Sequence, residues 1–274
     1  MSETENFAAE LPLEKRFGFG KNWAKFIDSH FSETRIDSSI SVFQNFTSIK
    51  ALDDVTFLDI GCGSGLHSLS ALKMGVKKLV SFDFDPNAVQ TTSRLRTMVG
   101  SPTNWEVSQG SILDPAFVNG LGKFDFVYSW GVLHHTGAVW KAIENASSLV
   151  GPQGKMYLAL YSLDVQPNAG YWLMIKEKYV NSSPVKKRIM EQSYLYKYYY
   201  GSSALRYICG FFKKEKGRTR GMELMTDVRD WLGGWPMEFV LDDEVVNFVS
   251  KLGFELRNIK KGEACTEFLF QKTS

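Results

Sequence analysis

The sequence predicts an α/β protein built on a doubly wound, mostly parallel sheet of seven strands, with a helical insert after the fifth strand. Its 274 residues include 44% hydrophobic and 23% charged side chains, a balance typical of a globular protein. Apolar segments of strand length alternate five times with segments of helical periodicity over residues 55–161. Parallel strands joined by crossover helices build such a sheet, and a final helix and strand pair extend it to seven strands.

The first half of the predicted core contains the clearest elements. Residues 55–60 are an apolar strand that is followed by glycines and then by Leu66, Leu69 and Leu72 at helical spacing. Residues 77–83 form the second strand, and Asp85-Pro86 is a typical helix start with proline in the first turn. The third strand is expected over 105–108 and the fourth over 124–129.

The rest of the core follows the same alternation. A helix is expected over 139–149, ended by Gly151-Pro152-Gln153-Gly154, and the fifth strand over 156–161. Near the C-terminus, Asp242 is expected to cap a helix, and 254–260 and 266–271 to form an antiparallel pair. The domains are therefore an N-terminal helical cap (1–54), a core (55–161 and 242–274) and an insert (162–241).

Several classes of protein are excluded by composition. No run of about 18 apolar residues predicts a transmembrane helix, and the acidic N-terminus lacks the features of a secretory signal. Three cysteines, Cys62, Cys209 and Cys265, form no CxxC pair, which predicts a reducing compartment and no structural metal. We therefore expect a cytoplasmic protein.

The predicted insert differs in charge from the rest of the chain. Residues 171–220 hold twelve Lys and Arg, three acids and eight of the eleven tyrosines, although the net charge of the chain is only +2. Three interpretations fit this segment: a lid over an anionic or aromatic substrate, a surface for lipid headgroups or nucleic acid, or a solvated helix pair or oligomer contact.

The loop after the first strand predicts a nucleoside site. Gly61, Gly63 and Gly65 form a GxGxG pattern, which differs from the dinucleotide fingerprint because Leu66 stands where that pattern needs glycine. Such glycines let the backbone approach a ligand and leave amide groups at a helix N-terminus. Asp83 lies 24 residues after Asp59, at the end of the second strand, where an acid can accept hydrogen bonds from ribose hydroxyls.

These motifs resemble those of class I S-adenosylmethionine-dependent methyltransferases. Asp59-Ile60-Gly61-Cys62-Gly63-Ser64-Gly65 is similar to their motif I, Val80-Ser81-Phe82-Asp83 to their second-strand acid, and 124–129 to their fourth strand. Residues 129–137 are most similar to the small-molecule branch that includes ubiquinone-biosynthesis O-methyltransferases. The resemblance covers 55–161 and, more loosely, 242–271. It implies a Rossmann-like methyltransferase fold, S-adenosylmethionine as the methyl donor, S-adenosylhomocysteine as product, no metal, and an oxygen of a small molecule as acceptor.

The same resemblance implies roles for individual residues around the cofactor. Gly61 and Gly63 would face its methionine part, Asp83 its ribose, and Phe84 its adenine. Ser111 and Ile112 would border the adenine edge, and Ser129 and Trp130 the methionine and sulfonium side. This chain departs from the family at Ser111, where many members have Asp. Core packing is the alternative for Phe84 and Ile112.

Two neighbouring histidines are the candidate catalytic residues. His134 and His135 follow the fourth strand, at the edge where open α/β sheets bind ligands. Histidine titrates near neutrality, which suits a base that removes a proton from the acceptor. The alternative is a packed ring without a catalytic part. No third ligand is spaced with the pair, so they do not predict a metal site.

Two aromatic clusters are candidates for the substrate pocket. One spans 17–23 and includes Phe19, Asn22 and Trp23, either as a mobile closing segment or as an aromatic staple onto the domain. The other spans 227–238 and includes Asp227, Trp231 and Trp235. Its acids fit either a pocket wall or a helix cap.

The insert follows the fifth strand, where this family builds substrate specificity, so the resemblance favours the lid. A small-molecule acceptor is therefore the expected partner, whereas nucleic acid and membrane surfaces are less favoured. Two other functions stay open: methylation of a nucleic acid or protein that docks on the basic insert, and a cofactor-binding module without turnover.

Overall fold

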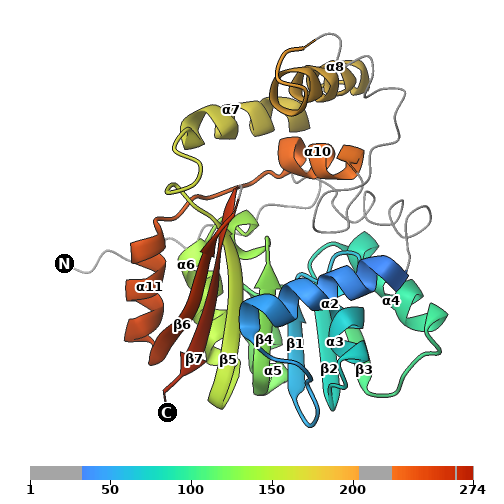
Figure 1. The fold of residues 1–274 in the computed structure, drawn as a ribbon, viewed down its shortest axis with the longest axis vertical. Helices are drawn as coiled ribbons and strands as arrows, with labels where there is room; N and C mark the ends of the chain where they lie inside the picture. The colour runs from blue at the N-terminus through green and yellow to red at the C-terminus, as the bar shows by residue number, and fades with distance from the viewer. Residues whose placement is uncertain (1–32, 204–223, 263, 274) are drawn as a thin grey trace.

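The sheet has the strand order β3-β2-β1-β4-β5-β7-β6 in a computed structural model that describes residues 33–203, 224–262 and 264–273 (Figure 1). The strands are β1 (Thr56–Ile60), β2 (Lys78–Asp83), β3 (Trp105–Gln109), β4 (Phe124–Trp130), β5 (Val150–Tyr161), β6 (Phe254–Lys261) and β7 (Cys265–Lys272). The first five are parallel to one another, and β7 runs antiparallel to both β5 and β6. The predicted fold class is confirmed.

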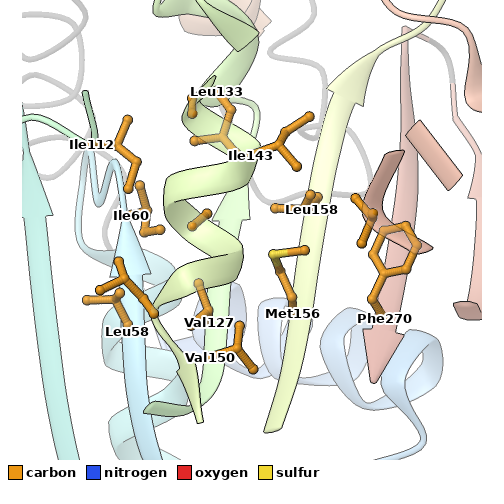
Figure 2. Close-up of a cluster of buried hydrophobic side chains, with 14 of the residues drawn as sticks. Leu58, Ile60, Ile112, Val127, Leu133, Ile143, Val150, Met156, Leu158 and Phe270 are labelled. Atoms are coloured by element: carbon orange, nitrogen blue, oxygen red, sulfur yellow. The ribbon is translucent and has the colours of Figure 1, made fainter. Parts of the chain in front are cut away.

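Helices cover both faces of this sheet. On one face lie α2 (Glu33–Thr47), α3 (Leu66–Lys73) and α4 (Pro86–Met98), and on the other α5 (Pro115–Leu121), the 3-10 turn η2 (Leu133–His135), α6 (Val139–Ser148) and α11 (Asp242–Lys251). Figure 2 shows part of the second layer, where Leu58, Val127 and Leu158 of three strands meet Ile143 of α6. The carboxyl ends of β1, β2, β4 and β5 share one edge, which therefore positions the candidate site.

The insert folds around a hydrophobic cluster of its own. It contains α7 (Ala169–Val180), α8 (Pro184–Tyr194), a π-helical turn η3 (Leu195–Tyr199) and α10 (Leu224–Gly233). Its buried side chains are Trp172, Tyr179, Leu195, Tyr200, Val228, Leu232 and Met237. In Figure 1 these helices are stacked above the sheet.

The two ends of the insert meet at the tip of β5. Ser162 and Val240 form an isolated parallel bridge. The N–H of Leu163 donates to the Val240 carbonyl at 2.9 Å, and the N–H of Val240 donates to the Tyr161 carbonyl at 3.1 Å. The chain therefore leaves the sheet and returns to it at one point.

The helix expected over 139–149 does end before Gly151, but the predicted start of the fifth strand at Met156 is wrong, because β5 begins at Val150. Val150 pairs with Phe124, and the register then jumps to Phe126 opposite Lys155. Gln153 takes a positive φ of 57° within this irregular stretch. The glycines and proline bulge the strand instead of delaying it.

The predicted cap of the last core helix is also wrong. The residue before α11 is Leu241, and Asp242 is already helical. The Asp242 carboxylate instead accepts from Ser162 Oγ at 2.7 Å, while its backbone N–H donates to Asp164 Oδ2 at 2.9 Å. An acid from the start of the insert therefore satisfies this helix terminus. By contrast, the predicted cap at Asp85 is confirmed, since its side chain accepts from the N–H of Asn87.

None of the described helices combines the length and apolar composition that a bilayer span requires.

Candidate active site

The glycine loop forms a tight turn between β1 and α3. Gly61, Gly63 and Gly65 have positive φ values of 75°, 53° and 77°, where a side chain is strained. A Cβ at Gly61 would also lie 2.4 Å from the Val132 side chain. The N–H groups of Gly61 and Cys62 both donate to the Phe82 carbonyl of β2, at 2.8 and 3.0 Å. These bonds fix the loop against the neighbouring strand.

Asp83 joins the glycine loop to the end of β2. Its Oδ2 accepts from the N–H of Gly63 at 3.0 Å and its Oδ1 from the N–H of Asp85 at 2.9 Å. Burial is the main cause that raises the pKa of this carboxyl to about 6. Each oxygen of an ionised carboxylate can accept more than one hydrogen bond, so Asp83 retains acceptor capacity toward a ligand.

Asp59 lies behind the loop rather than at its surface. It is buried and accepts from Ser68 Oγ at 2.5 Å, and Ser68 in turn is 2.8 Å from Ser81 Oγ. Burial raises its pKa to about 7, with the nearby Asp83 adding to the rise. Asp59 therefore holds α3 to the sheet and does not line the cavity described next.

One cavity of about 570 Å³ runs from the glycine loop to the insert. Its size is typical of a small-molecule site, for which roughly 300–1,000 Å³ is usual. It brings together most of the residues predicted from the sequence: Gly61, Gly63, Asp83, Phe84, Ser111, Ile112, Trp130, His135, Asp227, Trp231 and Trp235. Phe19, Asn22 and Trp23 lie outside the described residues.

Ser129 does not reach this cavity. Its side chain is fully buried between strands, and its hydroxyl donates to the Ile60 carbonyl of β1 at 3.2 Å. Ser129 thus links β4 to β1, and the neighbouring Trp130 supplies the side chain that lines the cavity.

His135 lines the cavity with a defined tautomer. Its Nδ1 lies 2.7 Å from the Pro236 carbonyl oxygen. Because a carbonyl can only accept, Nδ1 carries the hydrogen, and in the neutral ring the lone pair resides on Nε2. Gly234 packs against the same ring, where a Cβ would come within 2.8 Å of Cε1.

His134 has the other neutral tautomer and, unlike His135, does not line the cavity. The N–H of Tyr161 donates to its Nδ1 at 3.2 Å, so the hydrogen of the neutral ring is on Nε2. The ring is fully buried, and its centroid lies 4.0 Å from that of Tyr161, on which it stacks. Burial, with the charges of His135 and Lys176, holds its pKa well below the usual range. The structure thus places His134 behind the cavity wall, as a neutral packing residue.

The insert supplies an aromatic chamber at the far end of the cavity. Tyr161 at the tip of β5 meets Trp231 of α10 edge to face, with 5.4 Å between ring centroids. Tyr194, Tyr199 and Trp235 also line it. Asp227 and Asp230 line the cavity from within α10, which begins at Leu224, so neither is a helix cap.

A buried lysine of α7 packs against the aromatic residues of this chamber. Lys176 of α7 is fully buried and donates to the Trp231 carbonyl. Its Nζ lies 4.2 Å from the Trp231 ring centroid and 5.4 Å from that of Tyr161. Burial lowers its pKa to about 7, against the opposing effects of Cys265 and Asp230. Sequence analysis missed Lys176 and Tyr161, because neither belongs to a motif.

Short stretches of the chain are similar to methyltransferases whose names state a substrate. A ribosomal protein L11 methyltransferase from Colwellia psychrerythraea is 54% identical over 41 residues, which are 15% of this chain and 14% of that protein. A tRNA U34 carboxymethyltransferase from Cellvibrio japonicus is 28% identical over 110 residues, which are 40% of this chain and 34% of that protein. These matches therefore span about a third or less of the relatives' lengths.

A solved structure shows the fold over nearly the whole chain. Magnesium protoporphyrin IX methyltransferase from Synechocystis PCC 6803, crystallised with S-adenosylhomocysteine, superposes with a TM-score of 0.53. The match covers 92% of this chain and 93% of that one at 12% identity.

The chain also matches the profile of a methyltransferase domain family over residues 21–255, which is most of its length. This match agrees with the glycine loop, the second-strand acid and the strand order found above. The predicted enzyme class and its cofactor are confirmed at the level of the family, whereas the ubiquinone-related branch stays a prediction. The chain therefore belongs to the methyltransferase domain family, within the class I S-adenosylmethionine-dependent methyltransferases.

Proposed function

We propose that this protein transfers a methyl group from S-adenosylmethionine to an oxygen of a small molecule held beneath the insert. The observation that carries this proposal is the continuity of the cavity. Asp83 and the glycine loop lie at one end, the aromatic chamber lies at the other, and His135 also lines it. Donor and acceptor can therefore meet in one continuous cavity, where alignment supplies much of the rate.

The residues at the loop end fit the parts of the methyl donor. Asp83 would accept hydrogen bonds from the ribose hydroxyls, and the turn at Gly61 and Gly63 would admit the methionine part. Phe84 and Ile112 provide apolar surface for the adenine. When bound, S-adenosylmethionine supplies an electrophilic methyl carbon on a sulfonium leaving group, so the protein need not activate that carbon.

His135 would act as the base. Its Nε2 lone pair takes the proton of the acceptor hydroxyl while the oxygen forms its bond to the methyl carbon and the carbon–sulfur electron pair returns to sulfur. The Pro236 carbonyl stabilises the resulting imidazolium through Nδ1–H, at 2.7 Å in the present structure. His134 cannot share this role, because its Nδ1 is occupied and its Nε2 is protonated in the neutral ring.

A small, flat acceptor suits the chamber better than a polymer. On the insert side, the chamber is lined by Tyr194 and Tyr199 of the α8 and η3 segment and by Trp231 of α10. Aromatic side chains bury large areas and stack on rings.

Methylation of a nucleic acid or protein is the second candidate, and one observation favours it. Lys186 and Arg188 of α8 are exposed on the insert, as a docking face for an acidic macromolecule would require. The relatives named above act on a ribosomal protein and on tRNA, according to their names.

The test combines turnover with cofactor binding. Parent protein and His135→Ala are incubated with methyl-labelled S-adenosylmethionine and a panel of hydroxylated aromatic compounds, bulk tRNA and ribosomal proteins. We expect label in a small hydroxylated compound, and a rate lowered roughly 100-fold or more in His135→Ala at pH 7. Calorimetric titration with S-adenosylhomocysteine should give the same affinity for both proteins within about threefold, because His135 does not hold the cofactor in this proposal.

Each contrary result removes a different part of the proposal. An unchanged rate in His135→Ala would remove the base assignment. Label only in tRNA or ribosomal protein, abolished by high salt, would favour the second candidate. Cofactor binding without transfer to any acceptor would favour a binding module, and a folded parent that does not bind S-adenosylhomocysteine would exclude the nucleoside site.

A further inference from the structure

Exposed apolar side chains gather on the insert. Among the described residues, nine large hydrophobic side chains are exposed, and six of them lie within residues 171–198: Tyr171, Met174, Val185, Ile189, Tyr196 and Tyr198. The other three are Met98 in α4, Leu241 just before α11 and Ile259 in β6. Scattered exposed hydrophobic residues need no explanation, whereas a cluster of them marks an interaction surface.

The outer face of α8 and η3 carries an apolar stripe. Val185, Ile189 and Tyr196 follow one another at spacings of four and seven residues, which place them on one side of a helix. Val185 is 71% exposed and Ile189 is 60% exposed. The inner face of the same segment bears Glu191 and Leu195, which are buried in the insert. This segment therefore has a second apolar face that no described part of the chain covers.

Basic side chains flank that stripe. Lys186 and Arg188 are exposed beside Val185 and Ile189, on opposite sides of the stripe by helical geometry, and the exposed Lys197 follows Tyr196. The acid within α8, Glu191, points inward, where it accepts from the Tyr179 hydroxyl at 2.7 Å and pairs with Arg229 at 3.3 Å. The outer face consequently combines aliphatic surface with positive charge that no acid of the described part of α8 neutralises.

We propose that this face, which we call the α8 stripe (Val185, Lys186, Arg188, Ile189, Tyr196 and Lys197), docks on an anionic membrane surface. Helices that lie in the headgroup layer combine an apolar stripe with flanking Lys and Arg. Their basic side chains reach lipid phosphates while aliphatic groups enter the acyl boundary. Tyrosine suits that depth because it is apolar with a polar end.

The charge and the apolar composition of the α8 stripe favour a lipid surface over nucleic acid or a second copy of this chain. Nucleic acid would use the basic groups, but it offers no apolar layer to bury Val185 and Ile189. A second copy of this chain, paired through the same face, would bring like charges together. An anionic bilayer matches both properties of the α8 stripe.

Docking in this way would bring the cavity close to the lipid. Tyr194 and Tyr199 line the cavity and belong to the same α8 and η3 segment as the stripe. If the proposed function holds, an acceptor with an apolar tail could enter the chamber from the bilayer. Docking itself does not depend on that function.

Vesicle sedimentation tests the proposal with the full chain. Vesicles of phosphatidylcholine alone and with one quarter phosphatidylglycerol are pelleted with parent protein, Ile189→Glu and the double variant Lys186→Glu/Arg188→Glu. We expect the parent to bind the anionic vesicles at least tenfold more tightly than the neutral ones, and each variant to lose at least tenfold. Met98→Glu adds the same charge at an exposed apolar residue of α4 and should bind like the parent.

Several results would overturn the proposal that the α8 stripe docks on an anionic membrane. The parent, folded by circular dichroism, could fail to pellet with anionic vesicles, or Ile189→Glu could pellet as the parent does. Equilibrium sedimentation showing a parent dimer and a monomeric Ile189→Glu, with equal vesicle binding, would assign the stripe to a second copy. Binding of a single-stranded RNA oligonucleotide in place of vesicles would assign it to nucleic acid. Calorimetry with S-adenosylhomocysteine on the same samples separates these failures from failure of the methyltransferase site.

Discussion

Asp83 shapes the glycine loop, and in the proposed function the same carboxylate also binds the cofactor ribose. Both of its oxygens already accept backbone N–H groups, from Gly63 and Asp85, and the side chain still faces the cavity. Its raised pKa means that the ionised form is costly in this site, so its acceptor role should disappear in mild acid.

We therefore expect cofactor affinity to depend on pH through Asp83. Protonation below a pKa of about 6 removes an acceptor that the ribose hydroxyls need, so S-adenosylhomocysteine should bind about tenfold more weakly at pH 5 than at pH 7.5. In Asp83→Asn, affinity should be at least tenfold lower at pH 7.5 and nearly independent of pH. Calorimetric titration across this range checks both; a parallel pH dependence in the variant would assign the effect to another group.

His134 and His135 illustrate what sequence reasoning leaves undecided at this scale. Both have the same neighbours in the chain and the same chemistry, so both were candidate bases. Their roles separate only through distant partners, the Tyr161 N–H for one ring and the Pro236 carbonyl for the other. Those partners lie 27 and 101 residues away, beyond any local pattern.

At the scale of elements, Lys176 connects three segments. It belongs to α7, donates to α10 at the Trp231 carbonyl, and lies over the ring of Tyr161 at the end of β5. Among the described residues, Asp230 of α10, Cys265 of β7 and His134 of η2 interact electrostatically with it. Its protonation should therefore affect how firmly the insert is held to the core.

Lys176→Met should change the pH dependence of stability. The pKa is about 7 in the folded protein and near 10.5 when unfolded, so the unfolded chain binds more protons between these values and the parent gains stability as pH rises. Relative to the parent, Lys176→Met should thus be more stable at pH 6 than at pH 9, by up to roughly 3 kcal/mol.

Urea unfolding at both pH values measures this difference. Lys178→Met is the matched control, since Lys178 is exposed on the same helix, and it should show no such change. An equal effect of Lys176→Met at both pH values would show that the buried amine does not titrate in this range.

The elements of the core could be predicted from sequence because their signals are local. Alternating apolar segments located the strands, and Asp85-Pro86 marked the start of α4 correctly. The start of β5 was missed because a bulge with a positive φ at Gln153 resembles a loop. The cap of α11 was missed because its acceptor, Asp164, lies 78 residues away. The aromatic chamber was found only in part, since Tyr161 and Lys176 acquire their roles through packing.

At the scale of the molecule, three hydrophobic clusters divide the protein. Two fill the faces of the sheet, and the third belongs to the insert, with Tyr161 packed against it. Regions with separate clusters can open separately, which predicts that the insert loses structure before the sheet does.

Leu232→Ala should loosen the insert without unfolding the core. Leu232 is buried in the third cluster, and truncating a buried leucine costs about 2–5 kcal/mol. Hydrogen exchange should accelerate at least tenfold in the amides of α7 and α8 and stay unchanged in β1 and β4. Leu158→Ala, in the sheet cluster, is the comparison and should accelerate exchange throughout the sheet. Uniform acceleration in Leu232→Ala would mean that insert and core unfold as one unit.

The bridge between Ser162 and Val240 also indicates how related proteins can acquire different inserts. Because the insert begins and ends at neighbouring, hydrogen-bonded positions, a segment of different length and sequence can replace it without moving any strand. Recombination at these two positions would exchange the aromatic chamber, to which the proposed function assigns the acceptor, and would leave the glycine loop and Asp83 unchanged. Grafting the insert of a relative between Tyr161 and Leu241 is accordingly the natural design for altering substrate choice.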